Sequence, residues 1–276
     1  MIDARDWSAL TVGERIRQIE VEGYVVLPDL LSPGQIEQLK LQTSRLETVA
    51  VDYSVHQRVR SHLEFLGGAI TDLIAHPPTL EFLRELFGGE IVFMTYSYAR
   101  SEPGHPGISL HTDGQPYGSQ IFGYEGSCPC LVRVLYYLDD LTPEVAPFRV
   151  VPRSHLSMHA DANPYKRYEA HSEEVMVPVK AGGAALIHHR VFHGNYPNTG
   201  ARSREMLAIA YRPAWAGPIA DVARWDPQDV ARLPESVRPL FVDRNIRHWD
   251  FGGGNKPPNM GREAPSMNPS RWDRKR

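Results

Sequence analysis

The chain has 276 residues, of which 42% are hydrophobic and 23% charged, and its formal net charge is −3. This balance is typical of a globular protein. Acidic and basic residues are interspersed, so the sequence has no basic patch of the kind that binds nucleic acid. No apolar stretch approaches the roughly 20 residues that cross a bilayer, so we expect no membrane partner either.

The N-terminal sequence and the cysteine content both favour a reducing, cytoplasmic location. The N-terminus, MIDARDWSALTVGERIRQIE, has no apolar signal core, which favours a cytoplasmic location. Cys128 and Cys130 are the two cysteines; they are too few for a four-cysteine zinc site, and a Cys-x-Cys pair seldom suits disulfide geometry. The chain also lacks Ser/Gly linkers, charge blocks and repeats, which predicts a single domain over residues 1–276.

A helical flank is predicted over about residues 1–90. Apolar residues at helical spacing cover 8–23 and stop at Gly23, and a short strand with a turn follows over 24–32. Ser32 and Pro33 are a typical cap and first helical residue for a second helix. A third helix is expected over 77–89, closing at Gly88.

From about residue 90, the sequence pattern predicts short strands separated by Pro/Gly turns. These segments are rich in β-branched and aromatic residues, and they cover 90–100, 130–140, 148–152, 174–179, 183–193 and 204–213. A helical flank followed by many antiparallel strands predicts a mainly β protein: a double-stranded β-helix (jelly roll) core over about 91–213, with the N-terminal helices packed outside. Residues 214–276 are predicted to form an irregular Pro/Gly-rich tail.

Three His-x-Asp triplets occur, where the 12 histidines predict on the order of one by chance. On a strand, residues i and i+2 face the same side and can share one metal ion, with a third ligand from another strand. His248 comes too late for a later partner, and His159 lies in an expected loop. His111 and Asp113 follow the segment PGISL, about eighty residues before a strand with three histidines, and this triplet alone fits.

Two histidines and one carboxylate on a jelly roll form the facial set typical of non-haem Fe(II) oxygenases, which leaves three coordination positions open. The chain resembles the phytanoyl-CoA dioxygenase family of Fe(II)/2-oxoglutarate-dependent oxygenases. The resemblance rests on four segments between about 109 and 213: SLHTDG, LYYLDDLTPEVAPFRVVPRSHL, AGGAALIHHRVFHGNYPN and SREMLAIAYRP. Family members usually have Pro-Gly-Ser-His where this chain has an arginine, Arg153, which is expected on a loop near the barrel mouth and the substrate.

The resemblance also selects among the three clustered histidines. In the family, an arginine that pairs with the far carboxylate of 2-oxoglutarate follows the distal metal histidine by ten or eleven residues. Arg204 lies eleven residues after His193, so the implied metal ligands are His111, Asp113 and His193. His189, four residues earlier, is expected to face the same way in a supporting position, and His188 to face the opposite way. Arg202 is the alternative to Arg204, because residues two apart on a strand point to the same side.

Further residues are expected near the cosubstrate or substrate. The family uses polar side chains on the strand before the metal strand, which points to Tyr96, Tyr98 and Arg100, although the tyrosines also suit aromatic core packing. Asn195 and Asn198 lie in the turn after His193, where turn formation is the default role for both and contact with the cosubstrate is the alternative. Arg133 lies on a strand that should line the barrel, where it needs an acid or an anionic ligand.

The reaction that the resemblance implies converts 2-oxoglutarate and O2 into succinate and CO2 and hydroxylates a small organic molecule. Asp113 favours oxygenation, because halogenases of this superfamily have a small residue at that ligand. Two rivals remain open at this point: a cupin-like metalloenzyme that does not use 2-oxoglutarate and would not need Arg204, and a non-catalytic jelly-roll binding protein.

Overall fold

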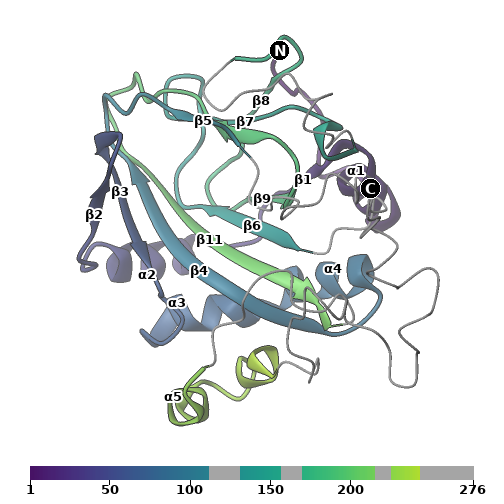
Figure 1. Ribbon diagram of the computed structural model, residues 1–276, viewed down its shortest axis with the longest axis vertical. Coiled ribbons are helices and arrows are strands. Elements are labelled where there is room, and N and C mark those ends of the chain that lie inside the picture. Colours follow the sequence, from purple (N-terminus) through teal and green to yellow (C-terminus); the bar gives the residue numbers. More distant parts are fainter. Residues whose placement is uncertain (112–130, 157–169, 215–224, 243–276) are drawn as a thin grey trace, which may run out of the picture.

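The computed structural model describes residues 1–111, 131–156, 170–214 and 225–242 (Figure 1). Two antiparallel sheets face each other and form the predicted jelly roll, so the fold class is confirmed. The larger sheet has the strand order β1 (Tyr24–Leu27), β9 (Ala184–His188), β6 (Val132–Tyr137), β11 (Arg204–Pro213), β4 (Ile91–Ser101), β3 (Ser54–Ser61) and β2 (Val49–Val51). The smaller sheet has the order β5 (Ile108–His111), β10 (His193–Asn195), β7 (Phe148–Val150) and β8 (Val175–Val177).

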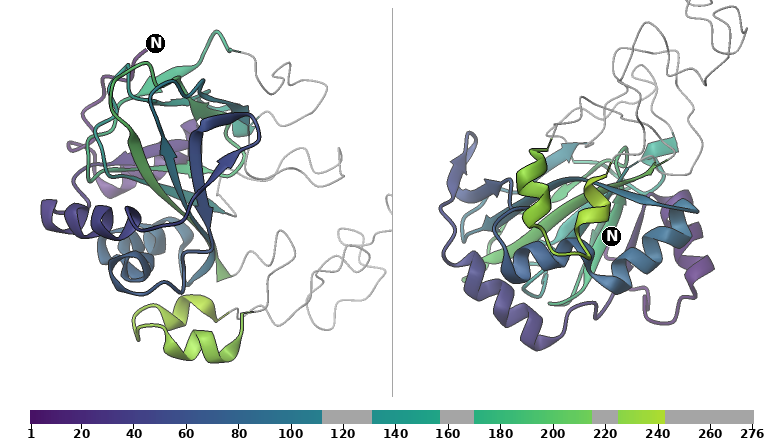
Figure 2. Two further views of the ribbon diagram at one scale, coloured as in Figure 1. Left: turned by 90° about the vertical axis from the view of Figure 1, so that its left-hand side faces the viewer. Right: turned by 90° about the horizontal axis from the view of Figure 1, so that it is seen from below.

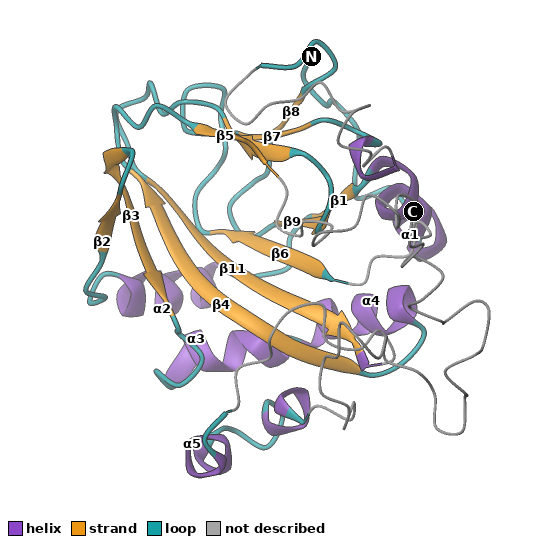
Figure 3. Ribbon diagram, viewed as in Figure 1, coloured by secondary structure: helices purple, strands orange, loops and turns teal. Residues whose placement is uncertain are grey.

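Helices cover the outer face of the larger sheet, with α2, α3 and α4 beneath it in the view of Figure 3. The α-helices are α1 (Val12–Glu22), α2 (Pro33–Thr43), α3 (Gly68–Asp72), α4 (Pro77–Phe87) and α5 (Pro227–Arg232). Short 3-10 turns are η1 (Leu73–Ala75), η2 (Ser154–Leu156) and η4 (Arg238–Phe241). In the described part of the chain, no helix is both long and apolar enough to cross a bilayer.

The predicted helix boundaries follow from local capping. Thr11 and Glu14 form a capping box at the start of α1, and Gly23 ends that helix in the left-handed conformation. Ser32 caps α2 in the same way with Gln35, as the sequence predicted. These reciprocal hydrogen bonds satisfy backbone donors that have no partner inside the helix.

Two sequence predictions about the flanks are wrong. The first 90 residues are not only helical, since β2 and β3 form a hairpin that extends the larger sheet beside β4. Gln57 is the one buried residue of β3, so the strand is held by backbone pairing and has little apolar pattern. The tail is not wholly irregular either, because α5 and η4 lie within it and Phe241 stacks on Phe93 with ring centroids 4.6 Å apart.

The segment 183–193, expected as one strand, is divided between the two sheets. β9 ends at His188 and pairs with β1 and β6 in the larger sheet. The chain then turns, and β10 begins at His193 between β5 and β7 of the smaller sheet. A parity argument along one continuous strand therefore does not relate His189 to His193.

The larger sheet has one face toward the helices and one toward the smaller sheet (Figure 2). On the helix side, the Tyr136 hydroxyl donates to Thr79 of α4 at 2.7 Å. Thr43 of α2 donates to Glu205 of β11 at 2.8 Å. Because successive residues of a strand point to opposite faces, Arg204 points to the other side, into the barrel.

β10 and β5 approach each other closely, and a glycine makes this approach possible. A Cβ atom added at Gly194 would lie 2.3 Å from the Ile108 carbonyl oxygen and 2.9 Å from that of Ser109. Both atoms belong to the backbone and cannot rotate away. The absence of a side chain at Gly194 therefore allows His193 to pair with His111 across the two strands.

We predict that Gly194→Ala separates β10 from β5 and lowers the free energy of unfolding by about 1–3 kcal/mol, as overpacking usually does. Chemical denaturation monitored by circular dichroism measures the change. Gly89→Ala is the matched control, because no heavy atom lies within 4 Å of a Cβ atom there. Equal stability of both variants would contradict the close packing.

Candidate active site

The structure brings His111 and His193 together from two paired strands. The two residues are direct partners in the register of β5 and β10. Their ring centroids lie 4.5 Å apart with an interplanar angle of 42°. Two imidazoles at this separation, on neighbouring strands of one sheet, can direct nitrogen atoms at the same metal ion.

Backbone carbonyls orient both rings. Nδ1 of His111 lies 2.7 Å from the Ser109 carbonyl oxygen, and Nδ1 of His193 lies 3.0 Å from that of Val191. A carbonyl oxygen accepts only, so each Nδ1 carries the proton and donates. In each ring the lone pair is then on Nε2, which is the arrangement found for histidines that bind metals.

The third expected ligand, Asp113, lies outside the described residues, as do His159, His248 and both cysteines. Within the described ranges, no group of three or more His, Cys, Asp or Glu side chains could hold a metal ion. His111 and His193 are therefore two candidate ligands that the structure brings together, and Asp113 remains a prediction from the sequence.

The remaining clustered histidines form a separate buried stack. The His188 and His189 rings stack at 4.6 Å with an interplanar angle of 13°, and His155 lies against His188 at 4.6 Å. Burial, reinforced by His189 and His155, strongly lowers the pKa of His188. His189 donates from Nδ1 to the Leu131 carbonyl at 3.1 Å. The expectation that His188 and His189 face opposite ways is wrong, because the chain leaves β9 between them.

Arg204 is completely buried at the start of β11, on the inner face of the larger sheet. Its three guanidinium nitrogens have no hydrogen-bond partner among the described residues. Burial lowers the pKa of Arg204. A buried guanidinium costs several kcal/mol in desolvation, and this cost is offset when an anion binds. Arg202, the alternative, is at the surface and donates to the Asp140 carbonyl at 2.9 Å.

Two other buried polar side chains accompany Arg204. The guanidinium carbon lies 5.7 Å from the centre of the Tyr137 ring, and the Tyr137 hydroxyl has no hydrogen-bond partner in the described part of the chain. Burial raises the pKa of Tyr137 to about 12, and the charge of Arg204 acts against this rise. His105 is 1% exposed, and neither of its ring nitrogens has a hydrogen-bond partner among the residues that the structure describes. The sequence analysis missed Tyr137 and His105; unpaired polar atoms become visible only in the folded chain.

The asparagines after His193 differ in role. Asn198 donates from its side-chain amide to the carbonyl oxygens of Ser101 at 3.0 Å and Arg202 at 2.9 Å, so it supports the turn before Arg204. This is the default turn role. Asn195 donates to the Ala146 carbonyl at 3.2 Å and lies on the same face of β10 as His193. Contact of Asn195 with a cosubstrate stays a prediction.

Tyr96, Tyr98 and Arg100 point away from the barrel interior, and their expected contacts with cosubstrate or substrate are wrong. Ser101 is the register partner of Arg204, so these three residues of β4 have the opposite parity. Tyr98 donates to Glu205 at 2.7 Å on the helix side. Arg100 pairs with Glu102 at 2.7 Å.

The inner face of β4 instead presents Ser97 and Thr95, opposite Ala208 and Ala210 of β11. Thr95 is exposed and Ser97 is half-buried, so both face open space. Arg133 shares this face through its pairing with Ala210 and remains a candidate for substrate contact.

Arg153 is explained by its backbone. Its φ of 64° is in the left-handed region, which accounts for the glycine usual at this place in the family. Its side chain is mostly exposed and lies 3.5 Å from Glu22 of α1. This contact directs Arg153 toward the helix, and a role toward substrate stays a prediction.

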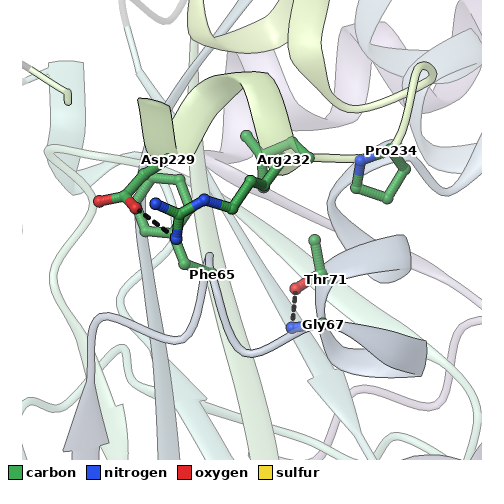
Figure 4. Close-up of a pocket in the computed structure, with 7 residues that line it drawn as sticks. Phe65, Gly67, Thr71, Asp229, Arg232 and Pro234 are labelled. Carbon is green, nitrogen blue, oxygen red and sulfur yellow. Dashed lines mark hydrogen bonds and ion pairs between the residues drawn. The ribbon is translucent and has the colours of Figure 1, made fainter. Parts of the chain in front are cut away.

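A surface pocket elsewhere does not contain the site. It lies between the segment after β3 and α5, at the opposite end of the molecule from β5 (Figures 1 and 4). Its polar groups already have partners: Arg232 pairs with Asp229 at 3.2 Å, and Gly67 donates to the Thr71 hydroxyl at 2.7 Å. The pocket is lined by Phe65, Gly67, Thr71, Asp229, Arg232, Leu233 and Pro234.

The fold and the site together define a jelly-roll protein with a histidine pair suited to a metal and a buried site suited to an anion. The model of the phytanoyl-CoA dioxygenase (PhyH) family matches residues 19–206. This chain belongs to that family, as the sequence resemblance indicated. No curated protein sequence resembles the chain closely enough to count as a relative.

Solved structures share the fold at low sequence identity. The chain is similar to SnoN, described as a non-haem α-ketoglutarate-dependent epimerase from nogalamycin biosynthesis, with 18% identity, a TM-score of 0.63, and coverage of 80% of this chain and 91% of SnoN. HygX from Streptomyces hygroscopicus, solved with nickel and 2-oxoglutarate, has 20% identity, a TM-score of 0.62 and coverage of 74% and 88%. The carbocyclase SnoK has 20% identity, a TM-score of 0.59 and coverage of 77% and 87%.

We predict that His111→Ala, Asp113→Ala and His193→Ala each strongly weaken Fe(II) binding, because each removes one of three protein ligands. Anaerobic titration followed by metal analysis of the desalted protein measures the stoichiometry, which is expected to be one ion per chain. His159→Ala and His248→Ala are controls and should bind normally. Full iron binding by the His193 variant would transfer the assignment to His188 or His189.

Proposed function

We propose that this protein is an Fe(II)/2-oxoglutarate-dependent dioxygenase that hydroxylates a small organic molecule and converts 2-oxoglutarate and O2 to succinate and CO2. The observation that carries the proposal is Arg204, a fully buried arginine with no hydrogen-bond partner in the described ranges, in a barrel that also holds the His111–His193 pair. Family membership supports the same class.

The residues fit both absent groups. His111 and His193 have Nε2 lone pairs for iron, and Asp113 would add the carboxylate ligand. Three protein ligands leave three positions for cosubstrate and dioxygen. The planar fork of Arg204 matches a carboxylate through two parallel hydrogen bonds, as the distal group of 2-oxoglutarate requires.

The iron and 2-oxoglutarate supply the oxidising chemistry, and the protein's part is to bind and orient. The Ser109 and Val191 carbonyls fix the two imidazole rings, so the ligand geometry exists before metal binding. Arg204 fixes the far end of the cosubstrate. The open inner face near Ser97 and Thr95 offers hydroxyl groups to a substrate, with Arg133 on the same face.

The rivals are less favoured by these observations. A cupin-like enzyme without 2-oxoglutarate would leave the Arg204 charge buried and uncompensated, at a large cost. A non-catalytic protein has no need of oriented imidazoles. Structural neighbours bind small molecules, since HygX was solved with hygromycin B and SnoN with nogalamycin RO. They also include an epimerase and a carbocyclase, so the outcome of the reaction needs its own test.

The class is tested by measuring succinate release from 2-oxoglutarate under Fe(II), ascorbate and air, with a library of small molecules. A compound that raises succinate release and gains one oxygen atom supports the proposal. Metal-dependent turnover of a compound with no consumption of 2-oxoglutarate would favour the cupin-like alternative.

We predict that Arg204→Leu raises the KM for 2-oxoglutarate by tens- to hundreds-fold, because a charge-assisted bidentate contact contributes about 1.5–3 kcal/mol. Initial rates of succinate formation against 2-oxoglutarate concentration measure the effect, and iron binding should persist. Arg202→Leu is the matched control at the surface. A larger effect of Arg202→Leu would show that the wrong arginine was chosen.

The expected reaction outcome depends on Asp113. Its carboxylate would occupy the coordination position that a halide needs, so hydroxylation, or desaturation and ring chemistry derived from it, should dominate. Turnover in chloride- or bromide-rich buffer under labelled O2 should yield no halogenated product by mass spectrometry. For simple hydroxylation, one labelled oxygen should enter succinate and one the product. A chlorinated product would refute the argument.

A further inference from the structure

The buried site around Arg204 contains more hydrogen-bonding capacity than one guanidinium. Within the part of the chain that the structure describes, six side-chain atoms lack partners there: the three nitrogens of Arg204, both ring nitrogens of His105 and the hydroxyl oxygen of Tyr137. Arg204 and Tyr137 are 0% exposed, and His105 is 1% exposed. Buried polar atoms in folded proteins nearly always have partners, so six unpaired atoms on three neighbouring residues indicate a bound polar ligand.

Backbone contacts hold His105 beside the start of β11. The Gly104 N–H donates to the Asn198 carbonyl and the Asn198 N–H donates to the His105 carbonyl, both at 2.9 Å. The Asn198 side chain donates to Ser101, which is the register partner of Arg204. The loop carrying His105 and the turn preceding Arg204 are thus one connected unit.

Charge decides what this site accepts. Burial, together with the neighbouring charges of Arg204 and His56, lowers the pKa of His105 to about 4, so the ring is neutral near pH 7. A neutral imidazole does not repel Arg204, and it has one N–H to donate. The site therefore has a single positive charge and additional neutral donors, which matches one carboxylate.

We propose that His105 and Tyr137 bind the distal carboxylate of 2-oxoglutarate together with Arg204, and that they select 2-oxo acids that have this second carboxylate. The inference rests on the proposed function. A carboxylate offers about four lone-pair sites, of which the arginine fork uses two. The His105 N–H and the Tyr137 O–H donate to the remaining ones.

Selectivity follows from the same atoms. A 2-oxo acid without a distal carboxylate can still reach the metal, but it leaves buried donors without partners. Sites built to hydrogen-bond a ligand group discriminate strongly against analogues that lack it. Loss of His105 or Tyr137 should therefore weaken 2-oxoglutarate and leave a monocarboxylic 2-oxo acid unaffected.

The test is calorimetric titration of the full chain loaded with Zn(II), a redox-inert and diamagnetic metal, with 2-oxoglutarate and separately with 2-oxobutyrate. For His105→Leu and Tyr137→Phe, the 2-oxoglutarate Kd should rise about tenfold or more, as expected for hydrogen bonds to a charged group. The Kd for 2-oxobutyrate should stay within about twofold of the wild-type value, because that ligand does not reach these donors. His56→Leu is the matched control, an exposed histidine beside the same loop.

A second measurement does not depend on the stability of any variant. In wild-type protein with ¹⁵N-labelled histidine, the ring signals of His105, assigned with His105→Gln, should shift on addition of 2-oxoglutarate and stay in place with 2-oxobutyrate. Unchanged His105 signals, or equal weakening of both ligands in His105→Leu, would overturn the inference.

The outcomes separate this inference from the proposed function. If Arg204→Leu loses 2-oxoglutarate binding while His105→Leu and Tyr137→Phe bind like wild type, the inference is wrong and the proposed function stands. If the wild-type Zn(II) protein does not bind 2-oxoglutarate, both fail.

Discussion

The structure depends on a buried positive charge whose hydrogen-bonding groups have no partner among the described residues. Arg204 is fully buried, and no described residue forms a hydrogen bond with the three nitrogens of its guanidinium. Such a group destabilises the fold without ligand by several kcal/mol, and an apolar residue of similar size at this position would avoid that cost. The same desolvation strengthens any interaction with an anion, because the surrounding medium screens it weakly. The barrel is thus arranged for a ligand, and its stability and its ligand affinity are linked.

The outer face of the sheet holds this charge in place. Glu205, the next residue, accepts hydrogen bonds from Thr43 at 2.8 Å and Tyr98 at 2.7 Å, and its backbone N–H donates to Asp139 at 2.8 Å. Asp139 in turn pairs with Lys40 of α2. Helix α2 therefore fixes the first residues of β11 from outside, and alternation along the strand converts this anchoring into a defined direction for Arg204.

The sequence predicted the features that depend on local pattern or on family motifs. Ser32 and Gly23 mark helix ends through caps that involve a few neighbouring residues, and the strands from 90 onward follow from their composition. Prediction failed where partners distant in sequence decide. Tyr98 and Arg100 were expected near the cosubstrate or substrate. The pairing of β4 with β11 decides which face of the sheet each residue is on, and it places both on the opposite face from Arg204. Residues 183–193 were expected as one strand because the turn that divides β9 from β10 has no Gly or Pro. His105 gives no signal before folding, since its burial is created by the turn at Asn198.

The turn at Asn198 explains physically why the spacing between His193 and Arg204 matters. The two residues lie on different sheets, and the chain between them is held at several points: Asn198 bridges to Val145, and the N–H groups of Thr199 and Gly200 both donate to the Glu144 carbonyl at 2.8 Å. A ligand that binds a metal through one end and Arg204 through the other has a fixed length. The turn must therefore be both short and rigid, because a slack connection would let the distance between the histidine and the arginine vary. The side-chain hydrogen bonds of Asn198 to Ser101 and Arg202 provide this rigidity, so Asn198 constrains the distance between the histidine and the arginine from within the turn.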